Sequence, residues 1–89
     1  MRTRKLALGD KNLIGARVTQ ARRAKGMTQK ALMARLQTAG VDISGPALSL
    51  LEGQKRPVTD LELFTLARLL EVSPHWLLGW DEQAEPQQP

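Results

Sequence analysis

The side chains of this 89-residue sequence that could do chemistry are mainly its lysines and arginines. Residues 1–56 hold 12 of the 13 basic residues against three acids, which gives them a net charge of +9. Residues 57–89 carry a net charge of −5. A cationic half predicts a polyanionic partner, with nucleic acid first and a membrane surface second. A solvated surface with uneven charge is the plain alternative.

Groups that commonly carry catalysis are sparse. His75 is the single histidine, and its place after Ser73 and Pro74 favours a surface residue at a helix start over a general base. The absence of cysteine excludes thiolate metal sites and cysteine nucleophiles. No two carboxylates stand at catalytic spacing on a shared face, and no glycine-rich phosphate loop is present. We therefore expect that the protein is not an enzyme and that it binds no metal ion and no cofactor.

The segment from Ser44 to Arg56 is typical of a short capped helix followed by a basic loop. Leu48, Leu51 and Glu52 share one helical face by their i, i+3, i+4 spacing, and we expect this face to point inward. The opposite face then carries small or apolar residues: Pro46, Ser49, Leu50 and Gly53. Such a helix is long enough to cross one DNA groove, at about 15 Å for ten residues. It offers few side chains that could read base edges.

Two helices are predicted before this segment. The first lies between Asn12, as its N-cap, and Gly26, as its C-terminal cap. The second begins at the cap Thr28 and ends near Gly40. No strand signal, internal repeat or linker interrupts them.

Two helices are predicted after the basic loop. Thr59 and Glu62 fit a capping box at the start of a helix that runs to about Glu71. This helix is apolar nearly all round, so we expect it at the centre of the core. Ser73 opens a short last helix that Gly79 ends.

The sequence divides into three parts. Residues 1–11 are a basic arm, residues 12–79 are the helical domain, and residues 80–89 are an acidic, Gln- and Pro-rich tail that we expect to be disordered. No apolar run is long enough for a signal peptide or a membrane span, so we expect no membrane partner and a cytoplasmic protein.

Taken in order, these elements resemble the phage-repressor-like (Cro-type, or xenobiotic-response-element) helix-turn-helix family. The resemblance runs from Leu13 to Gly79. It rests on several short matches: Gly-Met-Thr-Gln at 26–29, Glu-Gly-x-Lys-Arg at 52–56 and Ser-Pro-His-Trp-Leu-Leu-Gly at 73–79. It implies an all-α, five-helix, lambda-repressor-like domain in which the second and third helices form the helix-turn-helix. It further implies a prokaryotic or phage DNA-binding transcriptional regulator, acting as a dimeric repressor.

The resemblance also implies roles for single residues. Arg22 would pair with Glu52, and the need of an inward glutamate for a partner supports this pair independently. Thr28 and Gln29 would face a DNA phosphate at the start of the second helix, which suits the free N–H groups there. Lys55 and Arg56 would grip the DNA backbone. Lys30 is a weaker candidate for the same contact.

The sequence departs from the family at two points that affect DNA reading. Residues 37–43 make a longer connection between the second and third helices than the usual tight turn. The positions that normally read bases are Gly45, Pro46 and Leu50, which offer no side-chain hydrogen bond. Ser49 is the one hydroxyl on that outward face, and the capping Ser44 stands just before it. We therefore expect weak reading, by thymine methyl contacts and DNA shape.

Two interpretations of partners remain open. Trp76, Leu77, Leu78 and Trp80 could form a dimer contact, because related proteins often pair through the last helix, or Trp76 could close the core of its own chain. The second interpretation of function is an antitoxin-like or adaptor protein that uses Leu50 and Trp80 to contact another protein. A chain of this size leaves no room for a ligand domain, so we expect no small-molecule effector.

Overall fold

The computed structural model describes residues 11–80, so nearly all of the predicted arm and tail lies outside the described residues. This region is all-α and contains no strand. None of its helices combines the length and the hydropathy needed to cross a bilayer. The helices are α1 (Gly15–Ala24), α2 (Gln29–Thr38), α3 (Gly45–Glu52), α4 (Asp60–Leu70) and α5 (Pro74–Leu77).

Four of the predicted N-caps are confirmed. In each case a hydroxyl accepts a hydrogen bond from the backbone N–H three residues on, which satisfies a donor that has no partner inside the helix. The capping residues are Thr28, Ser44, Thr59 and Ser73. The capping box is also present, since the Glu62 carboxylate accepts from the backbone N–H of Thr59.

The start of α1 differs from the prediction. The helix begins at Gly15, with Ile14 as its N-cap residue, and Asn12 lies outside it. The Asn12 amide oxygen nevertheless accepts hydrogen bonds from the N–H groups of Ile14 and Gly15, at 3.0 and 2.8 Å. Asn12 therefore satisfies the first donors of α1 from a position further upstream than an N-cap.

The long connection between α2 and α3 is a packed segment. Val41 and Ile43 are buried in the core, and the side-chain amide of Gln37 donates to the carbonyl of Ile43 at 3.0 Å. The chain turns into this segment at Gly40, whose φ of 94° favours glycine. The extra residues therefore add to the core.

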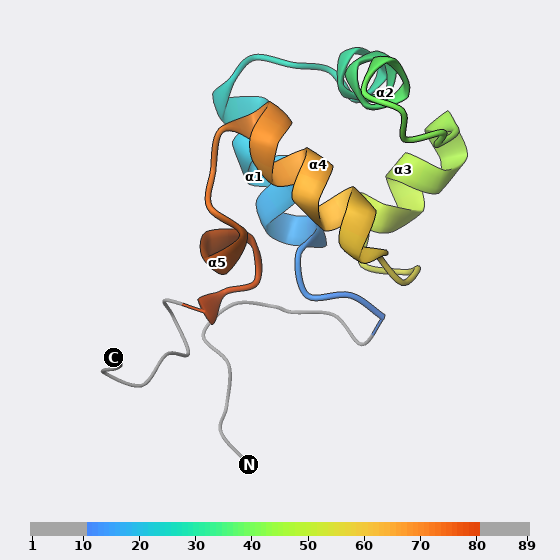
Figure 1. The fold of residues 1–89 in the computed structure, drawn as a ribbon. Coiled ribbons are helices and arrows are strands. Elements are labelled where there is room, and N and C mark those ends of the chain that lie inside the picture. Colours follow the sequence, from blue (N-terminus) through green and yellow to red (C-terminus); the bar gives the residue numbers. More distant parts are fainter. Residues whose placement is uncertain (1–10, 81–89) are drawn as a thin grey trace.

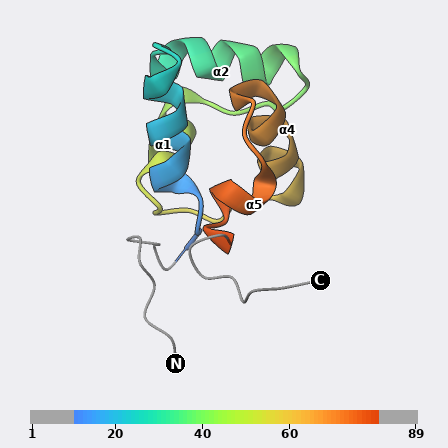
Figure 2. The same ribbon diagram turned by 90° about the vertical axis from the view of Figure 1, so that its left-hand side faces the viewer.

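The helices surround one apolar core (Figure 1). Figure 2 shows α1 and α4 on opposite sides, with α2 across one end and α5 at the other. The fully enclosed side chains come from every helix: Val18, Leu32, Leu36, Leu48, Leu51, Leu66, Leu70 and Leu77. Burial of this apolar surface stabilises the core, and no disulfide supports it, since the chain has no cysteine.

We expected α4 at the centre of the core, and only one of its faces lies there. One side of α4 packs against α1, α2 and α5, and the other side carries Leu61 and Phe64 with 56% and 57% of their surfaces exposed. The apolar residues around α4 suggested a central helix, but the other helices cover only one of its faces. An exposed apolar face remains.

The C-terminal helix is fixed to α1 by Arg17. The guanidinium of this buried residue lies 4.7 Å from the centre of the Trp76 ring and donates to the Trp76 carbonyl at 2.7 Å. Leu77 has no exposed surface, so its prediction as a dimer contact is wrong: it fills the core of its own chain. Trp76 and Leu78 are partly buried, and Trp80 remains 57% exposed.

Gly15 lies where α1 crosses the end of α3. A Cβ atom at this position would stand 2.3 Å from the carbonyl oxygen of Leu51 and 2.8 Å from that of Glu52. Both oxygens belong to the backbone of a packed helix and cannot move aside as a flexible side chain would. The crossing therefore requires glycine at position 15.

We expect Gly15→Ala to lower the free energy of unfolding by about 3 kcal/mol, because the added methyl group separates α1 from α3. Gly45→Ala is the matched control, since Gly45 also opens a helix but a Cβ there would lie at an ordinary 3.8 Å from the sulfur of Met33. Urea denaturation of both variants measures the difference. Equal stabilities would show that the two helices do not approach so closely.

Candidate nucleic-acid interface

The outward face of α3 is accessible along its length. Pro46, Ser49 and Gly53 are exposed and Leu50 retains 46% of its surface, whereas Leu48 and Leu51 are wholly buried. The helical register expected from the sequence is therefore confirmed. No side chain longer than leucine projects from this face, so the backbone of α3 can approach another surface closely.

The inward end of α3 is held by a buried carboxylate. Glu52 is 7% exposed, and its Oε2 accepts from Nε of Arg22 at 2.8 Å while its Oε1 accepts from Nη2 at 3.1 Å. The expected pair of Arg22 and Glu52 is present, and two bonds in parallel fix its geometry. The remaining Nη1 of Arg22 donates to the carbonyl of Met27 at 2.8 Å, between α1 and α2.

Two more donors complete the set around Glu52. The hydroxyl of Thr19 lies 3.0 Å from Oε1, and the side-chain amide of Gln29 donates to the same oxygen at 2.9 Å. One carboxylate thus joins α1, α2 and α3 by directional bonds. A buried carboxylate is tolerated away from water when donors surround its oxygens in this way.

Gln29 therefore differs from its predicted role. The sequence placed its amide toward a DNA phosphate, but the side chain is partly buried and bonds to Glu52. The reason is that a carboxylate has more acceptor positions than one guanidinium fills. At this end of α2 the exposed groups are Thr28, whose hydroxyl caps the helix, and Lys30.

Lys55 and Arg56, both predicted to contact the DNA backbone, have different surroundings in the loop after α3. Lys55 is exposed and forms no ion pair with any residue between 11 and 80. Arg56 is partly buried and bonds through both terminal nitrogens to the Glu62 carboxylate, at 3.2 and 3.1 Å. Of these two cations, Lys55 is therefore the one that is available to a partner.

Glu62 is well suited to hold Arg56. Burial acts to raise the pKa of Glu62, but the hydrogen bonds from Arg56 and Thr59 and the charge of Arg56 outweigh it, so the pKa lies below its ordinary value of 4.5. Because the folded pKa is depressed, this contribution to stability is present above the ordinary value. It is lost as the pH falls through the lowered one.

Asn12 fixes the path of the same loop from the other side. Its amide nitrogen donates to the carbonyls of Leu51 and Arg56, at 3.1 and 2.8 Å. With the two bonds that its oxygen accepts, this buried amide is fully satisfied. One side chain thus links the start of α1, the end of α3 and the basic loop.

Sequence reasoning missed these contacts of Asn12 and Thr19 and the pair of Glu62 with Arg56. Each joins segments that are far apart in the chain or stand in no helical register, and periodicity carries no signal for such contacts. That Glu52 needs a partner could be anticipated, because a glutamate on an apolar face requires one, and the resemblance implied Arg22 as that partner.

Lys25 makes an exposed ion pair with Glu71 at the far end of α4. The hydrogen bond and charge of Lys25 lower the pKa of Glu71. The ammonium group of Lys25 is therefore already paired with a carboxylate at the surface. Among residues 11–80, the exposed cations on α2 and just after α3 are Lys30, Arg35 and Lys55.

Comparison of the chain with protein-family models, with curated proteins and with solved structures gave no match.

We expect Glu52→Ala to lower the free energy of unfolding by about 3–5 kcal/mol, because it leaves the guanidinium of Arg22 buried without its counter-charge. Glu71→Gln breaks the exposed pair with Lys25 and serves as the control, which should keep the unfolding midpoint of the parent. Chemical denaturation at neutral pH compares them. A midpoint for Glu52→Ala equal to that of the control would contradict the structural role of the carboxylate.

Proposed function

We propose that the chain is a DNA-binding regulator of the lambda-repressor-like type, in which α2 and α3 form a helix-turn-helix and α3 enters the major groove. The observation that carries this proposal is the accessible outward face of α3, held on its inward side by the Glu52 network. A helix fixed to its neighbours by directional bonds can present its outer face to a groove without reorganising. Repression from a two-fold operator is the mode of action we propose for it.

Affinity would come from the accessible cations and from the start of α2. Lys30 and Lys55 are exposed at the start of α2 and just after α3, where they can neutralise phosphates. The first N–H groups of α2 add a site for one phosphate oxygen. Such contacts position the protein on DNA without carrying sequence information.

Selectivity would come from close approach. Gly45 and Pro46 provide no hydrogen-bonding side chain, and Leu50 can only contact a thymine methyl group or exclude water. Ser49 can bond to several bases or to a phosphate. We propose that this protein discriminates weakly between sequences, through methyl contacts and the deformability of the DNA.

One observation favours a second function, that of an adaptor. Leu50 lies 46% exposed on a face that has almost no hydrogen-bonding groups, as a surface for another protein would be. The two functions differ in their response to salt. Phosphate contacts weaken steeply with salt, whereas an apolar protein contact does not.

Selection of binding sites from random double-stranded DNA, at two salt concentrations, tests the proposed function. We expect a family of A·T-containing sites enriched at low salt, with a much lower yield at high salt. If the folded protein retains no DNA at low salt, the proposed function is wrong and the adaptor function remains.

We expect Lys55→Gln to weaken binding to all DNA sequences alike and to flatten the slope of log affinity against log salt by about one unit. Lys25→Gln is the control with the same change in net charge, because its ammonium group is bound to Glu71. The slopes are measured by fluorescence anisotropy on one duplex. Identical slopes in the two variants would remove the loop from the interface.

We expect Leu50→Gln to create a preference for adenine worth about 1–3 kcal/mol, since a glutamine amide can bond twice to that base. Leu50→Ala should instead broaden the preference at one A·T position. Both variants should have the melting temperature of the parent, because position 50 lies on the outward face. Base preferences unchanged in both would mean that α3 does not lie in the groove.

A further inference from the structure

The exposed face of α4 carries a stripe of four side chains that no described part of the protein covers. Leu61 and Phe64 are more than half exposed, and Asp60 and Arg68 are exposed at the two ends. Asp60, Phe64 and Arg68 follow one another at i, i+4 spacing, so they form one row along the helix. The guanidinium of Arg68 lies over the Phe64 ring, 5.5 Å from its centre.

The order of charges along this stripe makes it complementary to itself. Phe64 stands midway between an acid four residues before it and a base four residues after it. When two copies of α4 pack antiparallel about a two-fold axis at position 64, each Asp60 meets Arg68 of the second copy. The two Phe64 rings then meet at the axis, where aromatic pairs contribute beyond the area they bury. A two-fold contact requires this kind of self-complementarity.

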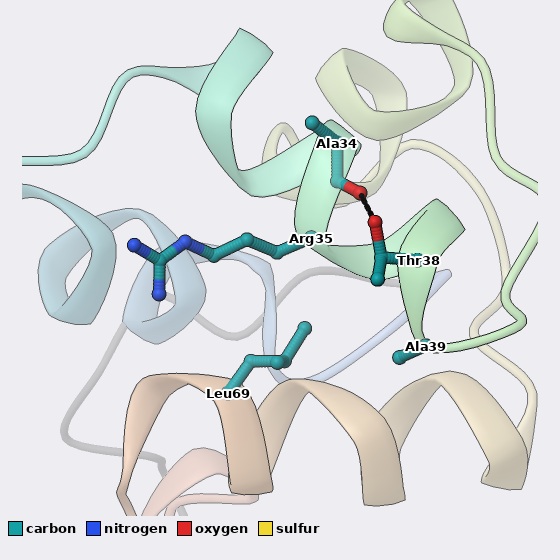
Figure 3. A pocket seen from close by; sticks show the side chains of 5 residues that line it. All are labelled: Ala34, Arg35, Thr38, Ala39 and Leu69. Atoms are coloured by element: carbon teal, nitrogen blue, oxygen red, sulfur yellow. Dashed lines mark hydrogen bonds between the residues drawn. The ribbon is translucent and has the colours of Figure 1, made fainter.

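A shallow hollow beside the stripe extends the same surface. It lies between the C-terminal half of α2 and α4 and is lined by Ala34, Arg35, Thr38, Ala39 and Leu69. Figure 3 shows Leu69 pointing from α4 toward α2, while the hydroxyl of Thr38 is turned to the carbonyl of Ala34. The lining of the hollow is therefore mainly apolar, with the Arg35 guanidinium to one side.

The antiparallel pairing brings Leu61 to this hollow. Positions 61, 65 and 69 form one row at i, i+4 spacing, so Leu61 lies on the edge of the stripe nearer Leu69. A two-fold axis perpendicular to the helices keeps this edge on the same side in both copies. Leu61 of the second copy then lies opposite position 67 and close to Leu69.

We propose that two copies of this chain associate through the exposed face of α4, antiparallel and centred on Phe64. This surface shares no residue with the outward face of α3, so two copies can associate without DNA and the contact is tested independently of the proposed function. It also differs from the segment expected from the sequence, in which Leu77 is buried and Trp80 alone is largely exposed.

Charge exchange provides the test that is specific to this geometry. Asp60→Lys and Arg68→Glu each place like charges opposite one another in a pair of identical copies, so each variant alone should associate about tenfold more weakly than the parent. An equimolar mixture restores both opposite-charge contacts, and sedimentation equilibrium without DNA should show a heterodimer. If the mixture associates no better than the separate variants, the antiparallel pairing is wrong.

A second set of variants tests the position of the contact without changing charge. Phe64→Gln removes the central ring from an exposed position, and we expect a monomer that keeps the circular dichroism and melting temperature of the parent. Leu50→Gln is the matched control on α3 and should leave self-association unchanged. If Trp80→Ala gives a monomer while Phe64→Gln does not, the last helix forms the contact and the proposal is overturned. A monomeric parent at high micromolar concentration would overturn it as well.

Discussion

The arrangement of this domain depends on one buried carboxylate. Burying a carboxylate such as that of Glu52 is unfavourable unless several donors surround it. Those donors come from α1, through Thr19 and Arg22, and from α2, through Gln29. Apolar packing alone would hold α3 against its neighbours while tolerating small rotations and shifts. Hydrogen bonds to one charged group have fixed lengths and directions, so they set the orientation of α3 relative to both other helices.

Both α3 and α4 have one face that packs in the core and another that is exposed to solvent. Two separate elements thus present two surfaces of different character. The face of α3 is small, weakly polar and close to accessible cations. The face of α4 is aromatic in the middle and oppositely charged at its ends. A single small core supports both because neither surface takes residues from it.

Local features of this fold could be predicted from the sequence, since their causes are local. The caps at Thr28, Ser44, Thr59 and Ser73 follow from hydroxyls placed before helical periodicity, and the inward side of α3 follows from the spacing of Leu48 and Leu51. The pair of Arg22 and Glu52 was implied by the family resemblance, and the need of an inward charge for a partner supported it.

The features that escaped prediction arise where distant segments meet. Gly15 is needed for a close approach between α1 and α3. Gly45 also stands at the start of a helix, but no neighbouring backbone approaches it, so glycine at a helix start does not by itself predict a close approach. Leu61 and Phe64 carry no mark that separates them from the buried residues of α4, because periodicity cannot tell how many neighbours a helix will have. Arg56 was expected to contact the DNA backbone, but in the folded domain its guanidinium bonds to Glu62.

The amide of Asn12 has a consequence for the entropy of binding. It bonds to the carbonyls at the end of α3 and at Arg56, on either side of Lys55. The backbone of this loop has therefore already lost its conformational freedom when the domain folds. A partner that contacts Lys55 has only that one side chain left to immobilise, and an ordered loop binds more tightly than a floppy one with the same contacts. The free energy of ordering the loop belongs to the folding of the domain.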